Sequence, residues 1–153
     1  MKKELKVRIL SSVFYGIFFG VVLTIVGSIL NNGRIVCENF PMQFISSTVI
    51  STFMGMLIPG GMISSVITEK ITKPGTVLYK AIFNSILMVI ILLYMCPLMT
   101  IFYGCVIGGA SIAAVLPGMF SMAPAFWVVC VLLLMIVGDS IMNLAIRIAI
   151  GKM

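Results

Sequence analysis

The sequence predicts an all-α integral membrane protein with four transmembrane helices, and three observations lead to this class. Of the 153 residues, 61% are hydrophobic and 9% are charged, which is too little polar surface to cover a soluble domain of this size. Four stretches reach the length of about 20 mostly apolar residues that a spanning helix needs. Helices also satisfy their own backbone hydrogen bonds in lipid, so they are the expected spanning structure.

We expect these helices at about residues 9–30, 42–67, 80–103 and 122–147 of a single membrane domain, 1–153. The first follows a basic N-terminus, but its apolar run of about 22 residues exceeds the core of a signal peptide, so we interpret it as a retained helix. A cytoplasmic loop is expected at 68–79. The segment 104–118 is small and uncharged, and it is expected to form a loop or a partly inserted segment.

The basic residues predict the orientation. Under this threading every lysine and arginine except Arg34 falls on one side of the membrane. By the positive-inside rule both termini and the central loop are cytoplasmic. The strong bias argues against the dual-topology multidrug exporters, which also carry a glutamate in the first helix that this chain lacks. The basic residues on the cytoplasmic side are Lys2, Lys3, Lys6, Arg8, Lys70, Lys73, Lys80, Arg147 and Lys152.

The composition also limits the function. With no histidine and four carboxylates, the chain lacks most of the groups that general acid–base or nucleophilic catalysis uses, so we do not expect an enzyme. The net charge of +6 lies in short clusters beside apolar segments, without the aromatic residues of a nucleic-acid surface. We therefore expect no nucleic-acid partner, and no sequence motif predicts a cofactor.

The two halves of the chain show a weak internal similarity. The stretch "IPGGMISSVI" at 58–67 aligns without gaps on "IVGDSIMNLAI" from Ile136, which pairs Gly60 with Gly138 and Gly61 with Asp139. This predicts two parallel two-helix repeats, 7–69 and 77–148, related by an axis along the membrane normal. Two unrelated hairpins are the alternative, because apolar segments match easily by chance.

Several motifs resemble a bacterial membrane family catalogued as domain of unknown function 2798. They are "NNGR" at the end of the first helix, "ENFPMQFISS" and "MGMLIPGG" around the second, and "LYKAIFNSILM" at the third. The resemblance implies a membrane location and a two-helix unit, and it implies no activity. Asp139 lies outside the family pattern. The matching positions are Asn31, Gly33, Phe40, Pro59, Asn84 and Ser85.

Asp139 is the one carboxylate inside a predicted helix. It stands eight residues before Arg147, or roughly 12 Å into the membrane core. An ionised aspartate there costs about 3 kcal/mol, so it should face the bundle interior, be protonated or be paired. Residues expected at a similar depth give a candidate substrate or proton site. The alternative is that they act as interhelical hydrogen-bonding residues. The set is Asp139, Asn143, Asn84, Tyr15, Pro59, Gly60 and Gly61.

Sulfur-containing residues give two weaker hypotheses. Met95, Cys96 and Met99 surround Pro97 and are the soft ligands that copper prefers, although lipid-facing side chains at a proline kink explain them as well. Cys37 and Cys105 both fall in the predicted outer loops. They are a possible disulfide in an oxidising compartment, and two free thiols are the default.

Small residues recur every four positions in two predicted helices. Ser47, Ser51 and Gly55 form one stripe, with Thr48 and Thr52 alongside, and Gly16 and Gly20 form another. Such stripes let two membrane helices approach closely, and the wall of a solvated pathway would show the same pattern. We favour helix packing.

The function expected from the sequence is a small transporter, or a transporter component, for a small solute or ion. The expected location is the bacterial cytoplasmic membrane. Four helices enclose little space, so we expect the chain to act as a homo-oligomer or with a partner membrane protein. The alternative is a non-catalytic membrane subunit that stabilises or regulates such a partner.

Overall fold

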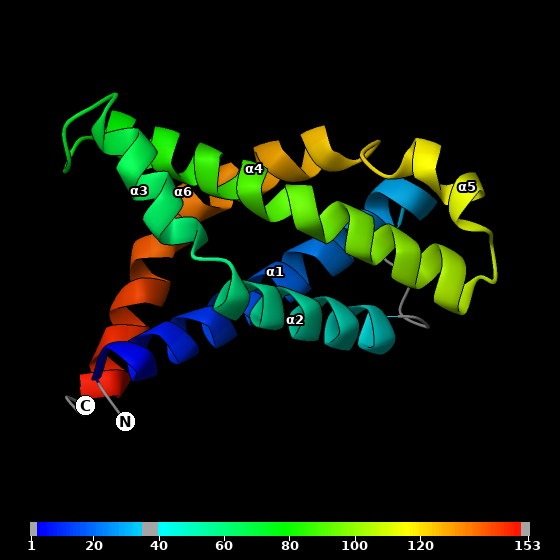
Figure 1. Ribbon diagram of the computed structural model, residues 1–153, viewed down its shortest axis with the longest axis horizontal. Coiled ribbons are helices and arrows are strands. Elements are labelled where there is room, and N and C mark those ends of the chain that lie inside the picture. Colours follow the sequence, from blue (N-terminus) through cyan, green and yellow to red (C-terminus); the bar gives the residue numbers. More distant parts are fainter. Residues whose placement is uncertain (1–2, 35–39, 151–153) are drawn as a thin grey trace. The chain divides into compact units, whose positions relative to one another are not determined.

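The computed structural model describes residues 3–34 and 40–150, and every regular element in these ranges is helical (Figure 1). Four helices are long and apolar enough to cross a membrane, and each overlaps one predicted span. The all-helical class with four candidate spans is thus confirmed. The elements are α1 (Lys3–Asn32), α2 (Phe40–Leu57), α3 (Gly60–Glu69), α4 (Val77–Ile101), the π-helix η1 (Phe102–Ile107), α5 (Ile112–Val115), the 3₁₀ turn η2 (Leu116–Gly118) and α6 (Ala123–Ile150).

The chain divides into two compact units. The terminal unit contains Met1–Pro59 and Leu132–Met153, and the central unit contains Gly60–Val131. The boundaries of these units differ from those of the predicted repeats, 7–69 and 77–148. The duplication and the membrane orientation stay predictions.

In the terminal unit α1 packs on α2 through small residues. Ser51 Oγ donates a hydrogen bond to the carbonyl of Gly16 at 3.1 Å, and Ser47 Oγ donates one to the carbonyl of Gly20 at 3.3 Å. The register is antiparallel, because higher numbers on α2 meet lower numbers on α1. The packing interpretation of the small-residue stripes is confirmed. The buried α1 stripe continues at four-residue spacing as Ser12, Gly16, Gly20, Thr24 and Ser28.

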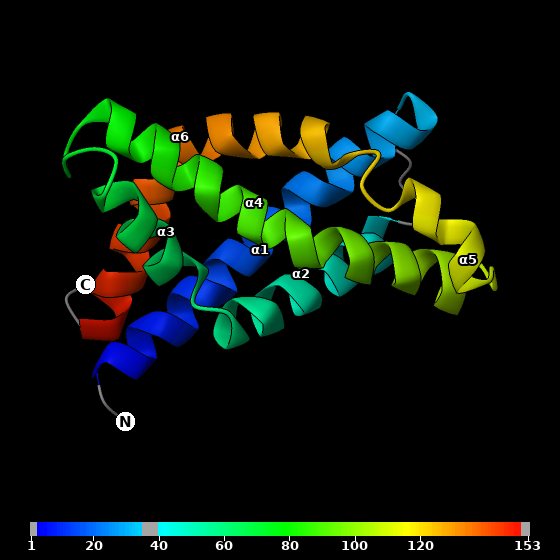
Figure 2. The same cartoon turned by 45° about the horizontal axis from the view of Figure 1, so that its top comes forward.

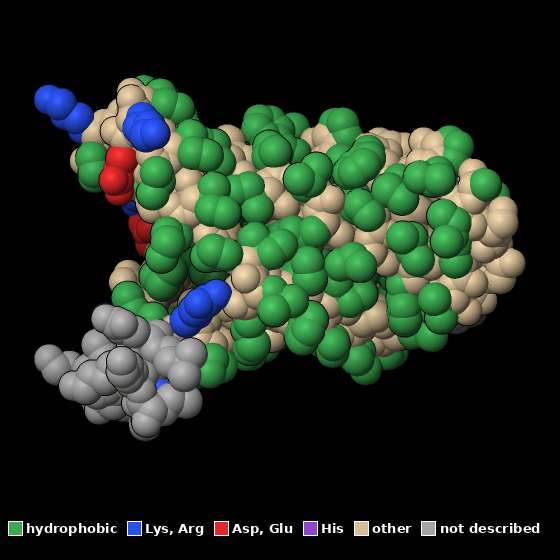
Figure 3. Space-filling view, viewed as in Figure 1, with side chains coloured by type: hydrophobic (Ala, Val, Ile, Leu, Met, Phe, Trp, Pro, Cys, Tyr) green, Lys and Arg blue, Asp and Glu red, His purple; other side chains and the backbone are tan. Residues whose placement is uncertain are grey.

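The outer surfaces of these helices are apolar. On α2 the side chains of Val49 and Phe53 are exposed, on the side opposite to the buried hydroxyls of Ser47 and Ser51. Figure 3 shows hydrophobic side chains over α2 and α4 on the face drawn. Small polar residues inside and large apolar residues outside are the arrangement expected for helices that contact lipid.

The second predicted helix, 42–67, is wrong in extent, because α2 ends at Leu57. Its last bond runs from the amide of Ile58 to the carbonyl of Met54 at 2.8 Å. Pro59 has no N–H to continue the ladder. The Arg8 guanidinium donates to the exposed carbonyl of Met56 at 2.6 Å, which places the end of α2 beside the start of α1.

In the central unit α3 packs on α4, and α4 starts earlier than predicted. The residues of α3 that are buried are again small and spaced by four: Gly60, Ser64 and Thr68. Thr76 caps α4, because its Oγ1 accepts a hydrogen bond from the amide of Tyr79 at 3.1 Å. Helical structure therefore begins at Val77 instead of residue 80.

Candidate functional site

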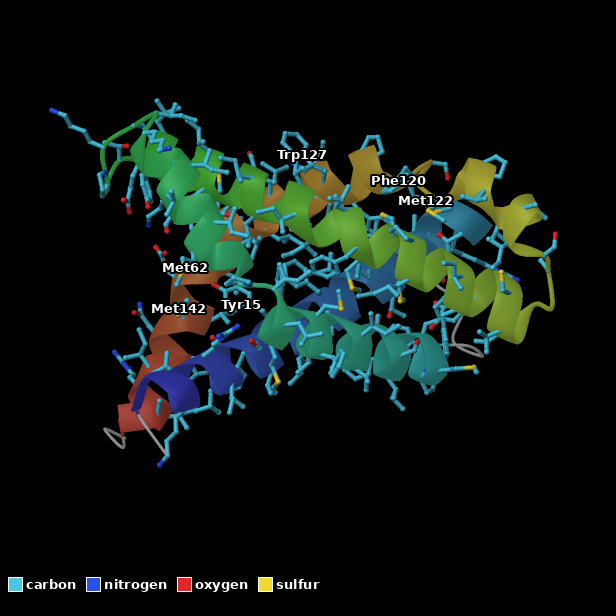
Figure 4. The ribbon with its side chains drawn as sticks, in the orientation of Figure 1. Tyr15, Met62, Phe120, Met122, Trp127 and Met142 are labelled. Atoms are coloured by element: carbon cyan, nitrogen blue, oxygen red, sulfur yellow. The ribbon has the colours of Figure 1, made fainter. Side chains whose placement is uncertain are left out.

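The first and last helices meet at Tyr15. In the terminal unit the Tyr15 hydroxyl donates a hydrogen bond to the backbone carbonyl of Gly138 at 3.2 Å (Figure 4). Asp139 follows Gly138 directly along α6. The structure therefore brings together two members of the predicted site, Tyr15 and Asp139.

This meeting follows from the position of both residues along their helices. Tyr15 stands seven residues after Arg8, and Asp139 stands eight residues before Arg147, so both lie about 10 to 12 Å from a basic residue at their helix end. The start of α1 and the end of α6 lie at the same end of the terminal unit (Figure 1). Tyr15 and Asp139 therefore lie at about the same level of the terminal unit. Their depth in a membrane stays a prediction.

The side chain of Asp139 does not point into the unit. The face of α6 that is buried carries Leu134, Gly138 and Ala145, which follow the period of a packed helix. Asp139 and Asn143 are exposed on the other face. Of the three alternatives expected for Asp139, the structure does not show burial within the terminal unit, because Gly138, with no side chain, takes the position against Tyr15. Protonation and pairing stay predictions.

The exposed face of α6 also holds Ser140 and Arg147, which the predicted candidate site did not include. Ser140 is exposed beside Asp139, and Arg147 is exposed one turn beyond Asn143. Asp139, Asn143 and Arg147 are spaced at i, i+4 and i+8, which places them along one side of a helix. The sequence alone shows this spacing, so it could have predicted that these polar side chains share one side of the helix. We call Asp139, Ser140, Asn143 and Arg147 the α6 polar stripe.

The other predicted site residues belong elsewhere. Asn84, Gly60 and Gly61 are in the central unit, and Pro59 ends the terminal unit. Gly60 lies against α4, since an added Cβ would come within 3.2 Å of Leu87 Cδ1, whereas Gly61 has nothing within 4 Å. Gly60 therefore has a packing role within its unit. A joint site of these residues with Asp139 stays a prediction.

The residues of the predicted copper site differ in their exposure. Met95 is 1% exposed, so it is a buried residue of α4 and not a lipid-facing one, while Cys96 and Met99 are half-buried. Within residues 3–34 and 40–150 no cluster of three or more His, Cys, Asp or Glu side chains could hold a metal ion. Cys105 is a free thiol, and its predicted partner Cys37 lies outside the described residues.

Comparison of the chain with protein families, curated proteins and solved structures finds no match. The resemblance to the two-helix membrane family therefore stays a prediction. The function has to be argued from the chain's own residues.

Proposed function

We propose that this protein is a small transporter, or the membrane component of one, and that Asp139 and Tyr15 form its proton- or cation-binding site. The chain would act as an oligomer or with a partner chain, in a bacterial cytoplasmic membrane and with both termini in the cytoplasm. The carboxylate would bind the cation or proton. The tyrosine hydroxyl, fixed on Gly138, would orient the site.

The observation that carries this proposal is the exposure of the α6 polar stripe on a helix long enough to span a membrane. A carboxylate, a hydroxyl and an amide are costly to present to acyl chains, so membrane proteins place such groups against water or another polar chain. A pathway between protomers satisfies this requirement. It also agrees with the small internal volume that four helices can enclose.

The same exposure favours a second candidate function. Asp139 could pair with a basic side chain of another membrane protein, and this chain would then be a subunit that stabilises or regulates its partner. Buried charge pairs between helices set partner choice, and removing one member is costly. This candidate requires no movement of ions or solutes.

The substitution Asp139→Asn separates the two candidates. Asparagine has the size of aspartate and keeps one accepting oxygen, but it cannot carry the charge of aspartate or exchange its proton. In proteoliposomes with an imposed pH gradient, a transporter would lose proton-coupled flux, by at least about tenfold for a site group, while its oligomeric state stays the same. Glu69→Gln is the matched control, because it makes the same chemical change at an exposed position at the end of α3.

Two results would go against the transporter. One is equal flux in the wild type, Asp139→Asn and Glu69→Gln. The other is loss of the oligomer or of a co-purifying partner in Asp139→Asn with no flux in the wild type, which supports the subunit function instead.

A further inference from the structure

The position of Trp127 shows an unexpected register between α4 and α6. In the central unit the Trp127 indole Nε1 donates a hydrogen bond to the backbone carbonyl of Ser85 at 3.2 Å. Figures 1 and 2 show α4 and the first turns of α6 running in opposite directions. In a simple hairpin that joins residue 103 to residue 122, Trp127 would lie opposite residue 98. It lies instead about 13 residues nearer the start of α4.

This register requires the chain to turn back along α4 before α6 begins. The indole reaches about 6 Å, or about four residues, so the backbone of Trp127 lies no further along α4 than about residue 89. The first residue of α6 is four residues before Trp127, and the two helices are antiparallel. The start of α6 therefore lies level with α4 at about residue 93 or earlier. The end of η1 is Ile107. The intervening residues, 108–122, must therefore return about 21 Å along α4. We call residues 108–122 the tip segment.

A return of this length brings part of the tip segment inside a bilayer. The span Val77–Ile107 has 31 residues and is about 46 Å long, which exceeds a hydrocarbon core of about 30 Å by about 16 Å. All of this excess of about 16 Å could lie outside the core at the η1 end. A return of about 21 Å is longer than that, so it still carries the last residues of the tip segment into the core. The part nearest α6 is thus at membrane depth.

The side chains of the tip segment suit this position. Ile112, Leu116 and Phe120 are exposed by 57%, 54% and 47%. The sequence has no charged residue between Lys80 and Asp139. Large exposed apolar side chains without a single charge are what a surface in contact with acyl chains requires.

Several backbone amides of the tip segment pair within the segment or with η1. Irregular backbone is costly in lipid because each free N–H or carbonyl lacks a partner there. Pro117 has no N–H, and α5 packs closely on η1, where a Cβ added to Gly104 would come within 2.5 Å of Val115 Cγ1. Amides that donate to a backbone carbonyl at 2.9–3.2 Å are those of Gly108, Ala110, Ala114, Met119 and Ser121, and that of Ala123 at the start of α6.

We propose that the tip segment is a membrane-embedded element that packs beside the end of α4 distant from Lys80 and presents Ile112, Leu116 and Phe120 to phospholipid acyl chains. The fourth membrane crossing then begins in α5 and η2, and α6 is its longer part. This proposal is independent of the transport function and rests on the central unit alone.

Spin-label accessibility tests the proposal. Nitroxide labels are attached to Leu116→Cys and Phe120→Cys in a chain whose native cysteines are replaced, in vesicles of phosphatidylethanolamine and phosphatidylglycerol. Lys73→Cys, in the exposed turn between α3 and α4, is the control for water contact. We expect high collision rates with oxygen and low rates with a water-soluble nickel complex at 116 and 120, and the reverse at 73.

Two outcomes overturn the proposal. High nickel accessibility at 116 and 120 makes the segment an aqueous loop, and low accessibility to both reagents means that protein, such as a second copy of the chain, covers it. Hydrogen exchange of the unmodified protein in nanodiscs gives a second test that does not depend on the substitutions. Exchange in 108–122 as slow as in α4 supports the proposal, and complete exchange within seconds overturns it.

Discussion

The Tyr15 hydroxyl donates a hydrogen bond to the carbonyl of Gly138, 3.2 Å away, and this bond joins α1 to α6 directly beside Asp139. Gly138 is buried at this contact and Asp139, the next residue, is exposed. A single residue step along α6 thus leads from its packed face to its polar stripe. The bond holds the backbone of α6 directly before Asp139.

Removing the hydroxyl should loosen α6 without creating a cavity. Tyr15→Phe keeps the ring, which stacks on Phe19 with centroids 6.3 Å apart, and loses only the bond to Gly138. Side-chain hydrogen bonds between membrane helices contribute about 0.6 kcal/mol on average, so we expect a loss near this value in the free energy of unfolding. Titration with sodium dodecyl sulfate in mixed micelles measures it.

Tyr79→Phe is the control for this experiment, because it removes a hydroxyl from the first turn of α4 in the central unit. If both variants lose the same free energy of unfolding, the loss comes from replacing any tyrosine by phenylalanine and not from the hydrogen bond to Gly138. If flux can be measured, Tyr15→Phe should lower it more than Tyr79→Phe, since the orientation of Asp139 then varies.

The close contact of α1 with α2 predicts a large effect from a single methyl group. A Cβ at Gly20 would overlap the hydroxyl of Thr48 and come within 3.3 Å of its backbone nitrogen. Gly20→Ala should therefore destabilise the protein by about 1 to 3 kcal/mol, the usual cost of overpacking. Gly61→Ala is the control, since Gly61 is helical with open space around it, and it should be neutral or slightly stabilising.

A second substitution identifies the source of that cost. The Thr48 hydroxyl is buried and, in the described part of the chain, has no hydrogen-bond partner, so Thr48→Ala removes the overlapping atom without breaking a bond. We expect Gly20→Ala to be less costly in the Thr48→Ala background, with an interaction energy of about 1 kcal/mol. Additive effects would show that the two residues do not touch.

The features that the sequence predicted correctly are local ones. Hydropathy over about 20 residues located the four candidate spans, and four-residue spacing identified Gly16, Gly20, Ser47 and Ser51 as packing residues. The break at Pro59 follows from the covalent structure of proline. Each of these can be read from a short window of residues.

The features that the sequence missed depend on which distant segments meet. The exposure of Asp139 results from the contact of its neighbour Gly138 with Tyr15, which is 123 residues away along the chain. The register of Trp127 on Ser85 depends on the path of an uncharged segment, where no charge marks the edge of the membrane. Apolar periodicity shows which residues prefer lipid or protein but not which helix they contact.

The end of α2 gives the last prediction. Pro59→Ala restores an amide that can donate to the carbonyl of Gly55, so α2 should continue past Leu57. The Met56 carbonyl would then gain an amide partner and depend less on Arg8, its present donor at 2.6 Å. We expect slower hydrogen exchange at residues 57–61 and a smaller cost of Arg8→Gln in the Pro59→Ala background. Pro74→Ala, in the exposed turn before α4, should change neither, and unchanged exchange at 57–61 would show that another contact ends the helix.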